Sequence, residues 1–505
     1  MASAPDIRTL GQLNAAGYRP RSVKDELRTN LIRKLRAGEE VFPGILGFEQ
    51  TVIPQIQHAL LARHDLILLG LRGQAKSRIV RMLVSLLDEW VPVVEGSEIN
   101  DDPLRPFSKF ARDLVEQCGE ATPIGWLHRE ARYGEKLATP DTSIADLIGD
   151  IDPIKAATRK LTYGDEEVIH FGLIPRTNRG IFAINELPDL QPRIQVGLLN
   201  IMEEQDIQIR GFNVRIPLDV AMIFTANPED YTNRGAIITP LKDRIDSQIL
   251  THYPKTLEIG VAITQQEAWQ DRNGAPTVHV PHVFREIVEQ VAFEARESEY
   301  VDQKSGVSAR LTRAALEDLI SSAERRALLN GEDETVVRVS DLLAVEPAVT
   351  GKVELVYEGE QEGVQGVARA LVGKAVAVLF KRYFPDPADK TEGRAAYGDV
   401  LGWFAQGNTL ELTPELPFEA YARVLDQVDG LRAVVKKHAP SDSPAETATM
   451  MELVLEALHQ HSLLGKDLLA ERATYADLMG SVLGQLGSFG EDDEDDDFED
   501  FRRYN

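Results

Sequence analysis

The residues with the clearest chemistry lie in one stretch, Gly70-Leu71-Arg72-Gly73-Gln74-Ala75-Lys76-Ser77. It follows the P-loop pattern G-x-x-x-x-G-K-[ST], except that alanine stands in place of the last glycine. Backbone N–H groups of such a loop converge on one point and favour an anion there. Lys76 adds a full charge for the β- and γ-phosphates of a nucleotide, and Ser77 offers its hydroxyl to Mg²⁺. We therefore predict a nucleotide-phosphate site made by Gly70, Gly73, Gln74, Ala75, Lys76 and Ser77. A glycine-containing turn with an exposed Lys-Ser pair is the alternative.

Ala75 is the departure from the pattern, and its effect depends on the backbone. If position 75 needs a positive φ, alanine costs about 1 kcal/mol where glycine would cost nothing. If the residue already opens the following helix, alanine costs little. The sequence leaves both possibilities open.

Two further apolar runs end in polar side chains that suit phosphate chemistry. Residues 180–184 are followed by Asn185 and Glu186, and residues 220–226 are followed by Asn227. Ligands of a doubly wound sheet bind at the carboxyl ends of its strands, so we expect these side chains beside the P-loop. Strands that simply end in polar residues are the alternative.

Each of these polar side chains has an expected role. Glu186 can orient and polarise an attacking water molecule. Asn185 stands where an aspartate usually holds the water shell of Mg²⁺; it keeps an oxygen acceptor but lacks the charge, so we expect weaker metal binding. The amide of Asn227 can hydrogen-bond the γ-phosphate or the attacking water.

The elements around the P-loop are those that such a site needs. The apolar residues 66–69 predict a buried parallel strand, and apolar residues at helical spacing between 79 and 87 predict the helix after the loop. Upstream, an apolar turn at 42–47 leads into a helix at 51–64. The turn could place Gly47 against a nucleotide base, and a plain packing turn explains it equally well.

Composition excludes several classes of protein. The 505 residues are 43% apolar and can form several domains, but no apolar run approaches the roughly 20 residues of a membrane span. The net charge of −26 argues against general nucleic-acid binding, and much of it lies in the tail at 491–500. Cys118 is the only cysteine, which excludes an internal disulfide framework and a cysteine zinc cluster. The N-terminus lacks a signal pattern, so we expect a cytoplasmic location.

With these motifs in order, the chain resembles the AAA+ ATPases of the MoxR and magnesium-chelatase I-subunit group over about residues 40 to 345. The resemblance rests on a Walker A segment at 70–77, a Walker B segment ending in Asn185-Glu186 and a sensor-1 asparagine at 227. It rests also on a helix at 199–204 followed by an inserted hairpin at 206–218, an arginine-finger segment at 241–245 and a sensor-2 segment at 306–310.

The resemblance implies several functional properties. ATP and Mg²⁺ are the implied cofactors, ATP hydrolysis is the implied activity, and the chain is expected to form a homo-oligomeric ring, a hexamer in this group. Arg244 would reach the nucleotide of a neighbouring subunit, although an ordinary ion pair with Asp243 or Asp246 is the alternative. Arg310 would be the sensor-2 arginine, with Arg313 as the runner-up. A partner carrying a von Willebrand A domain is implied by analogy only.

The predicted fold is α/β, with a P-loop AAA+ parallel sheet, a helical lid and a mainly α-helical C-terminal region. The predicted parts are a helical N-terminal arm at 1–40, a nucleotide-binding domain at 41–255 with insertions at 91–139, 158–175 and 206–218, a helical lid at 256–346, a mainly helical region at 347–489 and an acidic tail at 490–505.

Three functions remain open at this point. The first is a ring-forming ATPase that remodels a partner protein or drives metal-ion insertion. The second, motivated by Ala75 and Asn185, is a nucleotide-binding scaffold with weak hydrolysis. The third is an enhancer-binding transcription activator, which needs a Gly-Ala-Phe-Thr-Gly-Ala loop and a basic DNA-binding end; neither is visible in the sequence.

Overall fold

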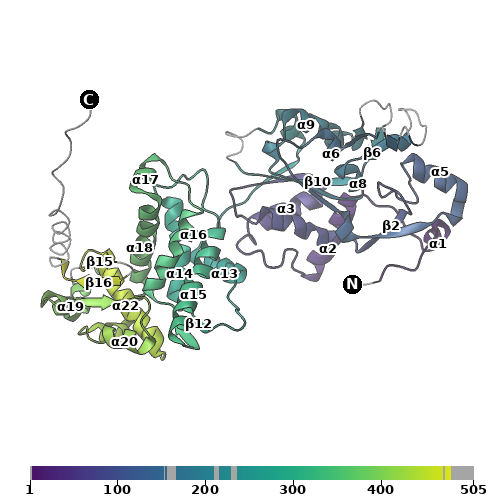
Figure 1. Ribbon diagram of the computed structural model, residues 1–505. Helices are drawn as coiled ribbons and strands as arrows, with labels where there is room; N and C mark the ends of the chain where they lie inside the picture. The colour runs from purple at the N-terminus through teal and green to yellow at the C-terminus, as the bar shows by residue number, and fades with distance from the viewer. Residues whose placement is uncertain are drawn as a thin grey trace, which may run out of the picture. The chain divides into compact units, whose positions relative to one another are not determined.

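The computed structural model describes residues 3–152, 154–155, 158, 166–209, 215–228, 236–389, 391–469 and 472–478. The chain divides into two compact units, Met1–Tyr253 and Pro254–Asn505, and Figure 1 labels their elements. The predicted acidic tail lies outside the described residues. Across the described ranges, no helix combines the length and the apolar character that crossing a membrane requires.

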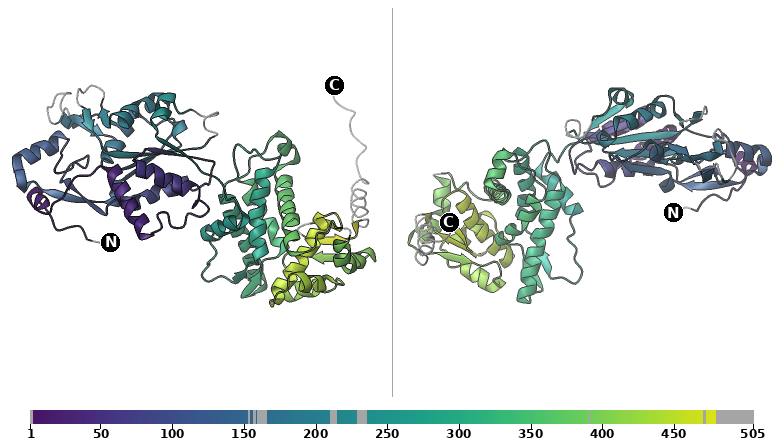
Figure 2. Two further views of the ribbon diagram at one scale, coloured as in Figure 1. Left: turned by 180° about the vertical axis from the view of Figure 1, so that it is seen from behind. Right: turned by 45° about the horizontal axis from the view of Figure 1, so that its top comes forward.

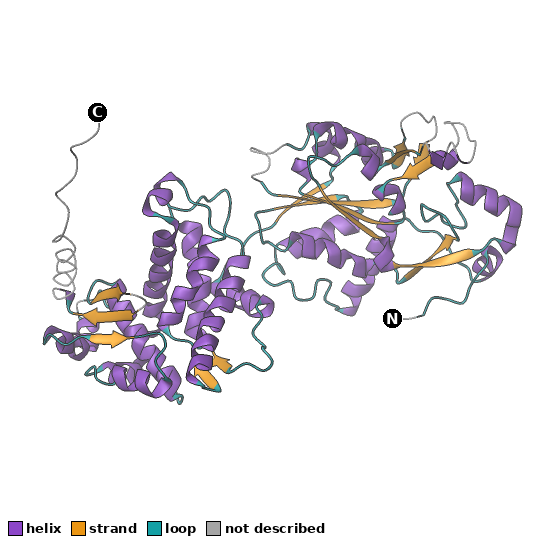
Figure 3. Cartoon of the chain, viewed as in Figure 1, coloured by secondary structure: helices purple, strands orange, loops and turns teal. Residues whose placement is uncertain are grey.

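The first unit is built on a parallel β-sheet, drawn in orange in Figure 3. Within the described residues this sheet has five strands in the order β11-β1-β10-β7-β4, and each neighbouring pair is parallel. The strands are β1 (Leu66–Leu69), β4 (Tyr133–Leu137), β7 (Gly180–Asn185), β10 (Val220–Ala226) and β11 (Ser247–Leu250). The sheet confirms the α/β fold that the apolar runs predict.

Helices precede, follow and connect these strands. In the first unit they are α1 (Leu10–Ala15), α2 (Val23–Ala37), α3 (Val52–Ala62), α4 (Lys76–Met82), α5 (Lys109–Cys118), α6 (Ile144–Leu147), α8 (Leu173–Arg176), α9 (Pro192–Gly197), α10 (Leu199–Glu203) and α12 (Thr239–Arg244). Figure 1 shows α2 and α3 on one side of the sheet and α9 on the other.

Alternate residues of the strands supply two separate cores, because successive side chains of a strand point to opposite faces. Leu66 and Leu68 of β1 belong to the core that α2, α3 and α4 cover. Ile67 and Leu69 of the same strand belong to the core that α8, α9, α10 and α12 cover. A sheet covered on both faces explains why its central strands read as unbroken apolar runs.

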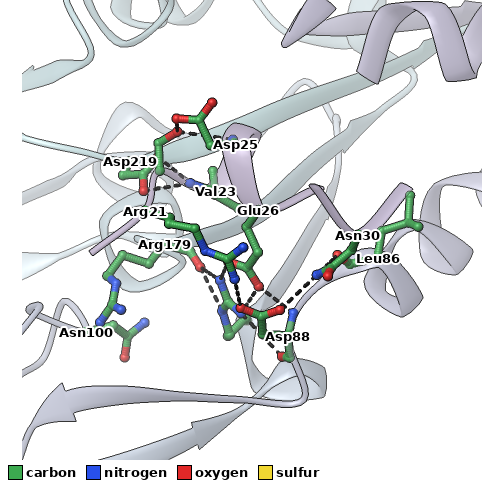
Figure 4. Close-up of polar contacts among 12 residues, drawn as sticks. Arg21, Val23, Asp25, Glu26, Asn30, Leu86, Asp88, Asn100, Arg179 and Asp219 are labelled. Atoms are coloured by element: carbon green, nitrogen blue, oxygen red, sulfur yellow. Dashed lines mark hydrogen bonds and ion pairs between the residues drawn. The ribbon is translucent and has the colours of Figure 1, made fainter. Parts of the chain in front are cut away.

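Residues of the predicted N-terminal arm pack against the sheet unit through buried polar contacts (Figure 4). Arg132 donates to both oxygens of Glu26, at 2.7 and 2.6 Å, and both side chains are buried. The side chain of Asn30 donates to Asp88 at 2.9 Å, and the backbone N–H of Val23 donates to both oxygens of Asp219. Helix α2 is therefore part of the first unit and contributes to its core.

The segment at 91–139, predicted as an insertion, has its own small sheet and ends in a strand of the main sheet. Strands β2 (Trp90–Val94) and β3 (Ile124–His128) pair antiparallel, with α5 between them in the chain. Strand β4 then forms the edge of the five-stranded sheet beside β7. The insertion therefore ends before Tyr133, and the boundary predicted at 139 is wrong. Its polar edge-strand sequence, with Glu135 and Lys136, lacks the apolar run that reveals a central strand.

The two predicted hairpins are described only at their bases. Strands β5 (Gly149–Ile151) and β6 (Ile169–Phe171) pair antiparallel, so the first hairpin begins earlier than the predicted 158–175. Strands β8 (Asp206–Gln208) and β9 (Arg215–Pro217) pair antiparallel within the predicted 206–218. The segments 159–165 and 210–214 lie outside the described residues.

The second unit is mainly helical, as the sequence predicts. Its elements are α13 (Leu257–Glu267), β12 (Thr277–His279), α14 (His282–Glu297), α15 (Arg310–Asn330), β13 (Glu334–Val336), α16 (Glu346–Thr350), α17 (Tyr357–Glu362), α18 (Val364–Tyr383), α19 (Glu392–Ala405), β14 (Leu410–Leu412), α20 (Phe418–Leu425), α21 (Leu431–His438), α22 (Pro444–Gln460), β15 (Gly465–Leu469) and β16 (Arg472–Ala476). Figures 1 and 2 show α14 and α18 side by side. One hydrophobic core contains residues from Val283 to Tyr475, so the division into a lid at 256–346 and a region at 347–489 stays a prediction.

Candidate functional site

Lys76 begins α4 directly after the P-loop, and its ammonium group is turned back into the loop. Nζ donates to the carbonyl oxygens of Gly70 and Leu71, the latter at 3.0 Å, and to Oδ1 of Asn227 at 2.8 Å. The residue is only 7% exposed, so these oxygens offset the desolvation of its charge. A nucleotide phosphate offers the same ammonium group charged acceptors, which make stronger hydrogen bonds than carbonyls.

The loop backbone decides between the two possibilities for Ala75. Its φ of 55° and ψ of 11° lie in the left-handed region, so the conformation is the one that glycine adopts without strain. Gly70 shows a different constraint. A Cβ atom there would lie 1.9 Å from Oγ1 of Thr251 and 2.1 Å from Oε1 of Gln74, so the close approach requires glycine.

The side chain of Gln74 connects the P-loop to the residue that follows β11. Its side chain is buried, and Thr251, directly after β11, donates a 2.6 Å hydrogen bond to its Oε1.

The turn containing Gly47 packs mainly by its apolar residues, since Phe42 and Ile45 are buried in the core beside α3. Contact of Gly47 with a nucleotide base stays a prediction.

Glu186 and Asn227 meet at the ends of neighbouring strands β7 and β10. Nδ2 of Asn227 donates to Oε2 of Glu186 at 2.9 Å, while Oδ1 of the same amide accepts from Lys76. Glu186 has a φ of 54° and a ψ of 50°, a left-handed conformation that costs a non-glycine residue about 1–3 kcal/mol and is concentrated at functional sites. The structure thus brings three predicted site residues into one hydrogen-bonded chain.

Asn185 has both ends of its amide engaged. Thr225 Oγ1 donates to Oδ1 of Asn185 at 3.0 Å, and Nδ2 of Asn185 donates to Oε1 of Glu135 at 3.0 Å. Thr225 Oγ1 also accepts from the backbone N–H of Glu186 at 3.3 Å. The oxygen that Asn185 was expected to offer to Mg²⁺ therefore has a protein partner, and its role as a metal ligand stays a prediction.

Glu135 on β4 is a carboxylate next to the site that the sequence analysis missed. Nε and Nη2 of Arg81, on α4, donate to its two oxygens at 2.9 and 2.8 Å, and the Tyr133 hydroxyl donates at 2.8 Å. The hydrogen bond from Arg81 holds the pKa of Glu135 below its usual range, so the carboxylate is ionised. No sequence motif marks Glu135, because the strand pairing of β4 with β7 alone brings it to this place.

The donor set suits a metal ion that arrives with its nucleotide. Within the described part of the chain, no group of three or more His, Cys, Asp or Glu side chains could hold a metal ion alone. Mg²⁺ on nucleotide phosphates keeps several waters and needs only one or two protein ligands. The exposed hydroxyl of Ser77 and the carboxylates of this region fit that requirement.

Arg244 ends helix α12 and pairs with Glu203 of α10, not with the predicted Asp243 or Asp246. Its Nε donates to Oε2 of Glu203 at 2.8 Å, and its Nη1 donates to the carbonyl of Pro240 at 2.9 Å. Its side chain is 28% exposed.

The two candidate sensor-2 arginines lie at the start of α15 in the second unit. Arg310 begins the helix and is exposed, and Arg313 pairs with Glu317 one turn along. The sensor-2 role stays a prediction.

Comparisons with known proteins find similarity over part of the chain. Residues 159–247 match the Sigma-54 interaction domain, a segment that includes β7, β10 and α12. The chain is 26% identical over 239 residues to the magnesium-chelatase subunit ChlI of Nostoc sp. strain PCC 7120, covering 46% of this chain and 59% of the relative. It is 27% identical over 238 residues to the magnesium-chelatase 38 kDa subunit of Cereibacter sphaeroides, covering 45% and 64%. Over nearly half of its length, this chain is therefore similar to the magnesium-chelatase I subunits.

The similarity of this chain to its relatives is partial. It spans less than two thirds of the length of either relative, and the MoxR half of the predicted group stays a prediction. Among solved structures, the chain is similar to a complex between subunits BchI and BchD of magnesium chelatase, with 20% identity, a TM-score of 0.33 and coverage of 64% of this chain and 98% of that one. It is also similar to NtrX from Brucella abortus, with 14% identity, a TM-score of 0.32 and coverage of 58% and 56%.

Proposed function

We propose that this AAA+ protein is an ATPase that binds ATP with Mg²⁺ at the P-loop and hydrolyses the γ-phosphate bond. The observation that carries the proposal is the hydrogen-bonded chain from Lys76 through Asn227 to Glu186, at 2.8 and 2.9 Å. It joins an ammonium group, an amide and a carboxylate from three segments that are far apart in the sequence. These are the groups that phosphoryl transfer to water requires.

Each residue has a distinct role in the proposed reaction. Lys76 exchanges its carbonyl acceptors for phosphate oxygens and stabilises the negative charge that develops on them. Glu186 holds the attacking water by hydrogen bonding and accepts its proton. Asn227, already bonded to both, keeps the carboxylate at a fixed distance from the ammonium group. When bound, Mg²⁺ supplies Lewis-acid neutralisation of the phosphate charge, and the Ser77 hydroxyl is the side chain to hold it.

The test compares ATP turnover and nucleotide binding in matched variants. Glu186→Gln keeps the hydrogen-bonding shape but cannot accept a proton, so turnover should fall about 10²–10⁴-fold while nucleotide binding persists. Lys76→Ala should lose binding itself. Glu130→Gln, at an exposed position in the same unit, is the control and should match the wild type. Equal turnover in the wild type and Glu186→Gln would instead favour the scaffold with weak hydrolysis.

We further propose that the chain forms a ring in which Arg244 acts on the nucleotide of the neighbouring subunit. An arginine that stabilises transition-state charge from a second subunit can be worth about 10³–10⁵ in rate. A heterologous contact of this kind closes into a ring, and six subunits is the number that the family resemblance implies. Mixing Arg244→Ala with Lys76→Ala chains should restore part of the activity. No recovery in rings shown to be mixed would contradict a shared site.

The work done by hydrolysis is a separate proposal. By analogy with magnesium-chelatase relatives, the ring remodels a partner protein carrying a von Willebrand A domain or drives insertion of a metal ion. Affinity capture with Glu186→Gln, which should hold bound ATP, would identify that partner. Its absence from every capture, with the wild type behaving alike, would contradict a nucleotide-dependent partner.

The match to the Sigma-54 interaction domain keeps a second candidate, an enhancer-binding transcription activator. The matched residues include segments of the ATPase core, which the two classes share. The second candidate requires DNA binding, which the net charge of −26 opposes. A binding assay with duplex DNA at low salt separates the two, and salt-sensitive binding would favour the activator.

A further inference from the structure

Position 185 carries an amide where the metal side of such a site usually has a carboxylate, yet an ionised carboxylate lies directly beside it. Oε1 of Glu135 is 3.0 Å from Nδ2 of Asn185. The parallel pairing of β4 with β7 sets this proximity, since Leu137 lies opposite Asn185 and Glu135 lies opposite Ala183. Residues two apart on a strand share a face, so Glu135 stands on the face that Asn185 occupies.

The amide of Asn185 suits a position beside the Glu135 carboxylate, because it can donate a hydrogen bond to it. An aspartate there would place a second carboxylate about one hydrogen bond away from Glu135, and two carboxylates so close cannot both stay ionised. Asn185 avoids that conflict and donates a hydrogen bond in its place. Its other end accepts from Thr225, so the amide orientation is fixed from both sides.

Glu135 is also tied to the helix that follows the P-loop. Arg81 donates to both its oxygens and lies four residues, about one helical turn, after Ser77. The side chain of Arg81 is 63% exposed and that of Glu135 only 25%, so water screens the positive partner more than the carboxylate. The pairing orients the carboxylate toward α4.

We propose that Glu135 supplies the negative charge of the metal side of the nucleotide site in place of residue 185. It acts through its charge and through the amide of Asn185, and is therefore a positioning residue. In this arrangement the carboxylate stands on the edge strand β4 instead of on β7, and the amide of Asn185 donates a hydrogen bond to it. The inference rests on the proposed nucleotide binding and predicts how that binding depends on Mg²⁺.

The test measures binding of a fluorescent ATP analogue over a series of Mg²⁺ concentrations, with thermal melting of the nucleotide-free protein alongside. Glu135→Gln should raise the Mg²⁺ concentration for half-maximal binding about tenfold, with Glu130→Gln as the matched control. Asn185→Asp alone should give no gain in Mg²⁺ affinity, because the hydrogen bond to Glu135 is lost and the two carboxyl groups repel each other. The double variant Glu135→Gln/Asn185→Asp should return the Mg²⁺ dependence to within about threefold of the wild type.

Several outcomes would overturn the inference. It fails if Glu135→Gln binds nucleotide with the wild-type Mg²⁺ dependence, or if the double variant is no better than Glu135→Gln. Should Glu135→Gln not fold, Asn185→Asp still decides, because a tenfold gain in Mg²⁺ affinity from that change alone contradicts the assignment. If the wild type binds no nucleotide, the proposed function fails and the inference falls with it. Wild-type binding with unchanged variants rejects the inference alone.

Discussion

Asn227 donates a 2.9 Å hydrogen bond from its amide nitrogen to Glu186, and its amide oxygen accepts from Lys76 at 2.8 Å. One side chain therefore connects the general base proposed for hydrolysis with the cation proposed for the phosphates. Because the amide has a donor at one end and an acceptor at the other, it fits a carboxylate and an ammonium group at the same time. Because Asn227 bonds to both residues, binding of a phosphate by Lys76 can change the position of the Glu186 carboxylate.

Removing the bridge should separate binding from chemistry. Asn227→Ala leaves Lys76 and its loop carbonyls in place, so nucleotide affinity should change less than threefold. Turnover should fall about 10²-fold, because a preorganised hydrogen-bond donor of this kind is worth that much in the rate. Steady-state ATPase assays combined with equilibrium nucleotide binding measure both. A parallel loss of affinity and turnover would show that Asn227 serves binding instead.

Ala75→Gly should stabilise the first unit. The left-handed φ of 55° costs alanine about 1–2 kcal/mol, while glycine adds about 0.5–1 kcal/mol of chain entropy to the unfolded state, which leaves a gain of about 0.5–1 kcal/mol. Urea unfolding measures it. Ala370→Gly, at an exposed position inside α18, has no strain to relieve and should lower stability by about 1 kcal/mol. A change of the same sign in both variants would contradict strain at position 75.

Glu203→Gln should release Arg244 from its ion pair. The pair joins two partly exposed side chains and is worth about 0.2–1 kcal/mol, so its loss raises the free fraction of Arg244 at most about fivefold. ATPase activity below the concentration at which rings are complete should rise by up to that factor. The activity measured against protein concentration tests it. Lower activity in Glu203→Gln would indicate that Glu203 positions Arg244 for its neighbour.

Asp219 should make the contact between α2 and the rest of the first unit sensitive to pH. Burial raises its pKa to about 6, opposed by the backbone N–H of Val23 and by the charge of Arg179, and Glu26 and Arg132 also act on it. A carboxyl whose folded pKa lies above its unfolded pKa stabilises the fold at low pH, and that contribution is lost as pH rises from about 4 to above 6. The loss amounts to about 2 kcal/mol.

Asp219→Asn removes this titration and keeps an oxygen to accept from Val23. Unfolding measured from pH 4 to pH 8 should show the wild type losing stability relative to Asp219→Asn by about 2 kcal/mol across that range. Parallel curves for the two proteins would show that the carboxyl titrates alike in the folded and unfolded states.

The central strands and the P-loop could be predicted because their signals are local. An unbroken apolar run such as Leu66–Leu69 records burial on both faces of a sheet, and the spacing of Gly70, Lys76 and Ser77 records a loop around phosphates. The edge strand β4 could not be predicted in this way. Its residues are partly buried or exposed, and its sequence has two adjacent charged residues and no apolar run, so it resembles a loop.

The sequence by itself determined which residue types stand at the strand ends and therefore which chemistry the chain can support. Only the tertiary structure decided the backbone conformation and the partners of these residues. Ala75 has a left-handed backbone, Arg244 pairs with Glu203, and Asn185 donates a hydrogen bond to Glu135. The reason is physical. Composition and spacing report the environment of one segment, whereas a hydrogen bond between residues 50 positions apart depends on how strands pair, which no single segment encodes.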